Sequence, residues 1–86
     1  MTTWRDEIEA EMAKRGETWA TVCGCTLDDA GLDAEFDHGL GGVEGVPFTV
    51  WTERRVYFPA CYDGGEWVAS VPRHPCGEAT EHIGGG

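Results

Sequence analysis

Residues 48–71, FTVWTERRVYFPACYDGGEWVASV, carry the strongest fold signal in this chain. Segments 48–52, 55–62 and 66–71 are rich in β-branched and aromatic residues whose side chains alternate between two faces, as in β-strands. A two-residue Glu-Arg turn separates the first two segments, and Asp-Gly-Gly separates the second from the third. The stretch therefore predicts consecutive antiparallel strands. Pro59 is expected at a bulge or on an edge strand, because it has no backbone N–H.

Residues 3–15 predict a helix that precedes the sheet. Thr3 is a typical N-cap, acidic residues occupy the first turn and basic residues the last, and Gly16 follows where a left-handed backbone ends many helices. Apolar residues recur at every fourth position in a narrow stripe, which predicts that the helix lies on the core rather than within it. The residues of this stripe are Trp4, Ile8 and Met12.

The segment between the helix and the hairpins carries weaker signals. Alternation predicts strands over 20–27 and 32–37 around an Asp-Asp-Ala-Gly turn, although Thr18 could instead cap a short helix at the start of the first strand. Four glycines within 39–46 predict a loop. The expected fold class is thus α+β, with an N-terminal helix packed on a four- to five-stranded antiparallel meander sheet.

A single α+β domain is predicted over 1–83, followed by a flexible glycine tail over 84–86. The tail is similar to the diglycine end of ubiquitin-like sulfur carriers, a resemblance that implies a carrier role. It covers the tail alone, because the β-grasp fold of those carriers begins with a hairpin and this chain begins with the helix. Fraying is the preferred interpretation.

Acidity is the most unusual property of the composition. Sixteen Asp and Glu stand against six Lys and Arg, for a formal net charge of −10, and eleven of the acids lie in residues 1–45. Direct binding to nucleic acid or to an anionic membrane is disfavoured, because phosphate contacts need Lys and Arg. The expected partner is a basic protein surface, such as that of a nucleic-acid-binding protein or complex, unless the acidity serves solubility alone.

No apolar segment of the sequence reads as an export signal or a membrane span. A cytoplasmic location is therefore expected, which is the host cytoplasm if a phage encodes the chain. In that reducing compartment the cysteines are expected to be thiols or metal ligands rather than disulfides.

A row of carboxylates is the feature with the clearest functional implication. Asp33, Glu35 and Asp37 occupy alternate positions, so in a strand they point to one face at a spacing of roughly 6–7 Å. That spacing resembles the charge spacing along one nucleic-acid strand, and Asp28 and Asp29 could extend the row. The residues expected to face the core from the same strand are Leu32, Ala34 and Phe36.

The predicted partner-binding surface adds to this row two acids from the polar face of the helix and two aromatic anchors. It comprises Asp28, Asp29, Asp33, Glu35, Asp37, Glu7, Glu11, Trp51 and Tyr57. In size, acidity and lack of active-site chemistry the chain resembles the small inhibitors that phages make against host nucleases and CRISPR effectors, some of which mimic nucleic acid. The resemblance implies a non-enzymatic inhibitor, of the anti-CRISPR or anti-nuclease class, whose acidic surface blocks a basic groove.

The alternative is a structural zinc module built from Cys23, Cys25, Cys61 and Cys76. Zinc sites normally use paired C-x₂₋₄-C knuckles, whereas here one pair has a single intervening residue and the other two cysteines stand alone. An EF-hand-like spacing from Asp33 to Glu44 lacks the required glycine and the flanking helices. Ser70 is the only serine and has no nucleophile-elbow context, so no catalytic residue, metal ligand or cofactor is predicted.

Overall fold

The computed structural model describes residues 1–37 and 43–84. Its elements, in chain order, are β1 (Thr2–Thr3), α1 (Trp4–Arg15), the 3-10 helix η1 (Trp19–Thr21), β2 (Val22–Cys25), α2 (Asp29–Asp33), β3 (Glu35–Phe36), β4 (Val50–Thr52), β5 (Arg55–Tyr62) and β6 (Gly65–Pro72). Strands β2, β4, β5 and β6 form the main antiparallel sheet in that order, and β1 pairs with β3 in a small second sheet.

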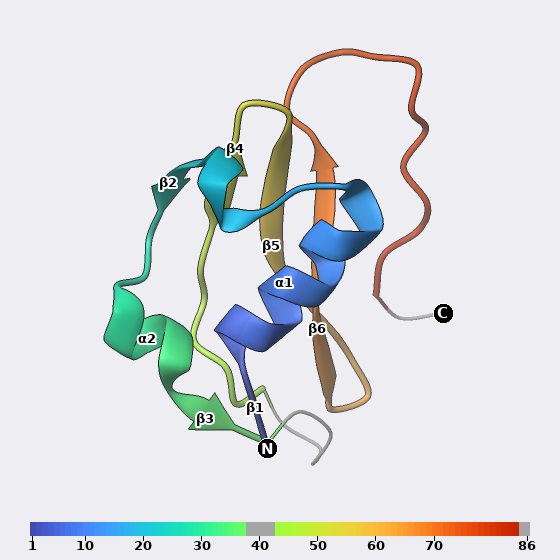
Figure 1. The fold of residues 1–86 in the computed structure, drawn as a ribbon. Coiled ribbons are helices and arrows are strands. Elements are labelled where there is room, and N and C mark those ends of the chain that lie inside the picture. The colour runs from blue at the N-terminus through green and yellow to red at the C-terminus, as the bar shows by residue number, and fades with distance from the viewer. Residues whose placement is uncertain (38–42, 85–86) are drawn as a thin grey trace.

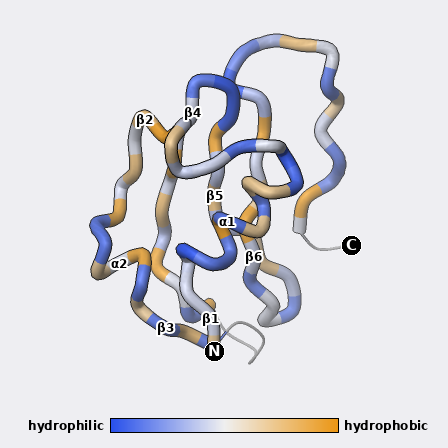
Figure 2. The backbone as a smooth tube through the Cα atoms, viewed as in Figure 1, coloured by the Kyte–Doolittle hydropathy of each residue, from blue (hydrophilic) through white to orange (hydrophobic). Residues whose placement is uncertain are grey.

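Helix α1 crosses one face of the main sheet, and α2 packs beside it (Figure 1). The predicted α+β architecture, an N-terminal helix on a four-stranded antiparallel sheet, is confirmed. Figure 2 shows hydrophobic stretches within β4 and β5 and the hydrophilic turn that joins them. After β6 the chain turns back and runs beside that strand toward the C-terminus (Figure 1).

Helix α1 begins and ends where the sequence predicts. The Thr3 hydroxyl accepts a hydrogen bond from the Asp6 N–H at 3.1 Å. Gly16 ends the helix with a φ of 72°, a left-handed conformation in which a Cβ would be strained, and its N–H points back to the Ala13 carbonyl. All three residues of the predicted stripe are buried, so this stripe is the surface by which α1 docks on the sheet.

The β4–β5 and β5–β6 hairpins are both confirmed. In the first turn the Thr52 hydroxyl accepts hydrogen bonds from the N–H groups of Arg54 and Arg55, at 3.2 and 2.9 Å, which closes the short connection. β5 pairs with β6 over its whole length, whereas it pairs with β4 only as far as Tyr57. Among the described strands only β6 pairs with β5 at Pro59, so a residue without an N–H is tolerated there.

The prediction of a strand over 32–37 is wrong. Most of the preceding turn and the first residues of that segment form helix α2, and β3 has only two residues, paired with β1. The cause is local, since the Asp28 carboxylate accepts a hydrogen bond from the Gly31 N–H at 2.8 Å and caps a helical turn. Of the three residues expected to face the core, two are buried and Ala34 is exposed.

Other boundaries also differ from the prediction. The strand predicted over 20–27 begins only at Val22, because the 3-10 helix η1 occupies the first residues of that segment. The Thr18 hydroxyl caps η1, which agrees with the alternative prediction of a short helix there. β4 is shorter than the predicted 48–52. Of the loop predicted over 39–46, residues 39–42 lie outside the described residues, as do two of the three tail glycines.

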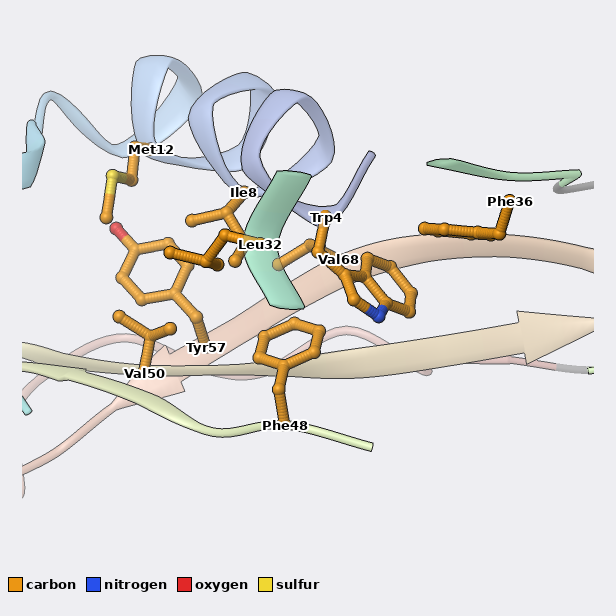
Figure 3. Packing of buried hydrophobic residues seen from close by; sticks show 9 residues of the cluster. All are labelled: Trp4, Ile8, Met12, Leu32, Phe36, Phe48, Val50, Tyr57 and Val68. Atoms are coloured by element: carbon orange, nitrogen blue, oxygen red, sulfur yellow. The ribbon is translucent and has the colours of Figure 1, made fainter. Parts of the chain in front are cut away.

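The core lies between the two helices and one face of the main sheet (Figure 3). The Trp4 ring is central, with its centroid 4.6 Å from that of Phe36 and 4.8 Å from that of Phe48. Its indole N–H donates to the Val46 carbonyl at 2.9 Å, and a Cβ at Gly45 would overlap the ring. The cluster consists of Trp4, Ile8, Met12, Leu32, Phe36, Phe48, Val50, Tyr57 and Val68.

Truncation of the stripe should destabilise the protein. Ile8 is fully buried, so Ile8→Ala leaves a cavity between α1 and the sheet and should lower the free energy of unfolding by about 2–5 kcal/mol. Lys14→Ala, at an exposed position of the same helix, should change it by less than about 0.5 kcal/mol. Urea unfolding followed by tryptophan fluorescence measures both. Equal midpoints for the two variants would mean that α1 does not dock through this stripe.

Candidate functional site

Carboxylates gather at the end of the molecule where α1 begins. The first turn of α1 supplies two of them, α2 and its N-cap supply three, and β3 with the residue after it supplies two. These elements are neighbours, because β1 pairs with β3 and α1 packs on α2. We call this surface the acidic end; it comprises Asp6, Glu7, Asp28, Asp29, Asp33, Glu35 and Asp37.

Arg5 holds two carboxylates of the acidic end together. Its Nε donates to Asp33 Oδ1 at 2.6 Å and its Nη2 to Asp29 Oδ1 at 3.0 Å. The guanidinium also lies over the Trp19 ring, 5.6 Å from the centroid. The hydrogen bond from Arg5 lowers the pKa of Asp33 and, with the bond to Asp29, raises the pKa of Arg5. Both partners therefore stay ionised, and Arg5 neutralises part of the local negative charge.

The predicted row of three evenly spaced carboxylates is wrong. Asp33 ends α2 and bonds to Arg5, while Glu35 lies on β3 and Asp37 follows it, so one strand does not carry all three. Asp28 is not part of a surface row either, because its carboxylate caps α2. The acids are close in space, but the regular spacing that resembled a nucleic-acid strand is absent from this part of the described chain.

Glu11 is not on the solvent-facing side of α1, contrary to the prediction. It is 5% exposed, and its Oε2 accepts hydrogen bonds from the Ser70 hydroxyl at 2.8 Å and from Arg15 Nε at 2.9 Å. Its position explains the burial, since it follows Ile8 by three residues and so belongs to the same helical face. Glu7 remains near the surface, where its carboxylate accepts from the Thr2 hydroxyl at 2.7 Å.

Tyr57 is not an exposed anchor, contrary to the prediction. Its side chain is fully buried, and its hydroxyl donates to Glu17 Oε1 at 2.6 Å. Burial, together with this carboxylate, raises the pKa of Tyr57, so the phenol stays protonated. Thr52 donates to the same oxygen at 3.1 Å. Trp51, the other predicted anchor, is partly exposed, but strand alternation turns it to the opposite face of the sheet from the helices.

A second ionic contact, between buried Arg55 and exposed Glu78, ties the C-terminal segment to the sheet. Arg55 donates through Nε to the Ser70 hydroxyl at 2.9 Å and through Nη1 and Nη2 to both oxygens of Glu78, at 2.9 and 3.0 Å. The bidentate hydrogen bonding between the two side chains raises the pKa of Arg55 and lowers that of Glu78. A cleft of about 220 Å³ lies between this segment, β6 and the end of α1. Among the described residues every buried side-chain nitrogen and oxygen has a hydrogen-bond partner, so these groups serve the fold.

The cysteines do not form a common site. Cys23 and Cys25 lie in β2, Cys61 lies at the far end of β5, and Cys76 lies in the segment after β6. Cys23 accepts a hydrogen bond from Arg73 Nη1 at 3.3 Å, and its thiol is free. Within residues 1–37 and 43–84, no group of three or more His, Cys, Asp or Glu side chains is arranged to hold a metal ion.

The Arg5–Asp33 pair gives a test by pH. Arg5→Gln removes the hydrogen bond and the charge that lower the pKa of Asp33, so this pKa should rise toward 3.8. Because the folded-state pKa is depressed, the pair stabilises the fold above about pH 4 and loses that contribution as the pH falls through the folded-state pKa. The stability difference between wild type and Arg5→Gln should therefore shrink on acidification. Carboxyl NMR titration measures the pKa, and Lys14→Gln, which removes a charge from the same helix, should leave it unchanged.

Comparisons with protein-family models, with curated proteins and with solved structures found no match to this chain. Among the described helices, none has both the length and the apolar character that crossing a membrane requires. The arrangement of the side chains themselves is therefore what bears on function.

Proposed function

We propose that the chain is a non-enzymatic interaction protein that uses its acidic end to block a basic surface on a nucleic-acid-handling partner. The observation that carries this proposal is that three neighbouring elements supply seven carboxylates to one end of the molecule, of which Arg5 pairs with two, Asp29 and Asp33. Such a field of one sign raises the rate of encounter with a basic groove and disfavours acidic partners.

The proposal differs from strict mimicry of a nucleic-acid strand. The carboxylates come from a helix end, a short helix and a strand rather than from one strand, so their spacing is irregular. Complementarity then rests on the density and sign of the charge, not on a repeat that matches phosphates. Asp6, Glu35 and Asp37 are available for a partner, since no ion pair within the described chain involves them.

The zinc module is the less favoured candidate. Its four thiols lie on three separate segments. β4 separates β2 from β5, and Cys25 is in register with Tyr57, four residues along β5 from Cys61. A structural zinc would need them within one coordination sphere at about 2.3 Å from the metal. Charge density at the acidic end is therefore the stronger basis for a function.

Charge reversal at the acidic end should abolish partner binding. The test variant carries Asp6→Lys, Glu35→Lys and Asp37→Lys, which leave the Arg5 contacts and the α2 cap intact. The matched control carries Glu44→Lys, Glu53→Lys and Glu81→Lys, all at exposed positions in loops, turns or the C-terminal segment. Both variants raise the net charge from −10 to −4. Wild type and control, but not the test variant, should capture the same proteins from a lysate at low salt.

The captured proteins should bind nucleic acid, and adding the chain should displace that nucleic acid in a salt-dependent competition assay. Circular dichroism confirms that both triple variants are folded. Equal loss of binding in both variants would assign the effect to net charge alone. Unchanged binding in both, or captured partners that keep their nucleic acid, would refute the proposal.

A further inference from the structure

The face of the main sheet opposite α1 is apolar. Strand alternation and the register of β4, β5 and β6 place Trp51, Val56 and Val71 in one row across the three strands, with Phe58 opposite Ala69 and Trp67 opposite Ala60 in the next rows. None of these side chains is charged, and three of them are aromatic rings. We call it the outer face; it comprises Trp51, Val56, Phe58, Ala60, Trp67, Ala69 and Val71.

No described helix covers the outer face. The core residues contributed by α1 and α2 pack with Val50, Tyr57 and Val68, which alternate with the outer-face residues along their strands (Figure 3). Both helices therefore lie on the inner face. The C-terminal segment is fastened there through Glu78 to Arg55, and it runs along the β6 edge, where it also borders Trp67 and Ala69 of the outer face. An antiparallel sheet that is solvated on one side normally carries polar residues on that side, but the side of β4 to β6 that faces away from the helices carries the apolar set named above. That pattern is typical of a sheet with a further layer on it.

The two ends of the outer face carry opposite charges. At one end Arg54 and Arg73 are adjacent, since the Arg73 N–H donates to the Arg54 carbonyl at 2.8 Å. Among the described residues neither arginine makes an ion pair, and Arg73 donates instead to the Thr52 carbonyl. At the other end of β5 the turn presents Asp63, and the exposed ring of Tyr62 lies beside it. Glu53 lies at the first end as well, which leaves that end with a net positive charge.

We propose that the outer face is the docking surface for a second copy of this chain. Two copies related by a two-fold axis that lies in the plane between the two outer faces and runs perpendicular to the β5 strands would stack face to face with these strands antiparallel. Arg54 and Arg73 of each copy would then lie against Asp63 of the other. The apolar rows would then close on one another at the ~10 Å spacing of stacked sheets. Two-fold contacts of this kind need a self-complementary patch, and an apolar centre with oppositely charged ends meets that requirement.

The distribution of charge also favours the outer face, rather than the rest of the surface, as the site of self-association. Two chains of charge −10 repel one another, and most of their carboxylates lie on the helices and loops. The outer face is a surface through which they can associate without placing like charges in contact. The acidic ends, on the helix side, then point away from the dimer interface, so this inference is independent of the proposed function and compatible with it.

Sedimentation equilibrium of the wild-type chain from micromolar to near-millimolar concentration should show a reversible monomer–dimer equilibrium. Phe58→Glu, near the middle of β5 and of the two-fold contact, should raise the dissociation constant by at least about tenfold, because it places like charges face to face. Ala10→Glu, which adds the same charge at an exposed position of α1, should leave dimerisation nearly unchanged. A wild-type chain that stays monomeric throughout, or equal effects of the two variants, would overturn the proposal.

A double-mutant cycle at Arg54 and Asp63 tests the dimer even if the Phe58→Glu variant does not fold. Arg54→Glu and Asp63→Asn should each weaken the dimer, and asparagine suits the positive φ of 51° at position 63. In the Arg54→Glu background, however, Asp63→Asn should strengthen the dimer, because it removes a repulsion between copies. Within one chain these residues are separated by the length of the eight-residue strand β5, too far to couple directly. Additive effects with no change of sign would refute the antiparallel arrangement.

Discussion

Trp4 docks α1 on the main sheet, and this contact fixes how the helices, the small sheet and the main sheet are arranged. The indole packs against Phe36 and Phe48 and donates to the Val46 carbonyl, so it joins the helix to β3 and to the segment that leads into β4. Gly45 allows the backbone to pass under the ring. In a chain of 86 residues few other groups bury comparable area, and aromatic burial dominates the energetics of so small a core.

The same docking buries polar side chains, and each of them needs a hydrogen-bond partner in the interior. Glu11 and Glu17 enter with the helix and its C-terminal extension, and they are met by hydroxyls of Ser70, Tyr57 and Thr52. Removing one of those hydroxyls would leave a buried carboxylate short of a hydrogen bond, which costs more than the net value of the bond. These contacts therefore set the register of the helix over the sheet more strictly than apolar packing alone would.

A single layer of helices divides the molecule into two dissimilar surfaces. The helix side carries the acidic end, where Arg5 holds α2 against the start of α1, and the other side carries the uncharged outer face. A partner recognised by charge and a partner recognised by apolar contact would thus approach from opposite sides. The asymmetry follows from having one long helix, which can cover only one face of a sheet.

Features that depend on a few neighbouring residues can be predicted from the sequence. Thr3 and Gly16 bound the helix through local hydrogen bonds and backbone conformation, and the short turns set the hairpins. Which face of β5 is inside depends on packing against α1, because apolar and aromatic residues occur on both sides of the strand and offer little contrast. Tyr57, which the sequence analysis places on the surface, is buried for this reason. Asp33 and Glu11 were misplaced for a related reason. Asp33 lies in a helix because the Asp28 cap of α2 prevails over the strand alternation of this segment. Glu11 is buried because the folded sheet places the Ser70 hydroxyl beside this face of α1.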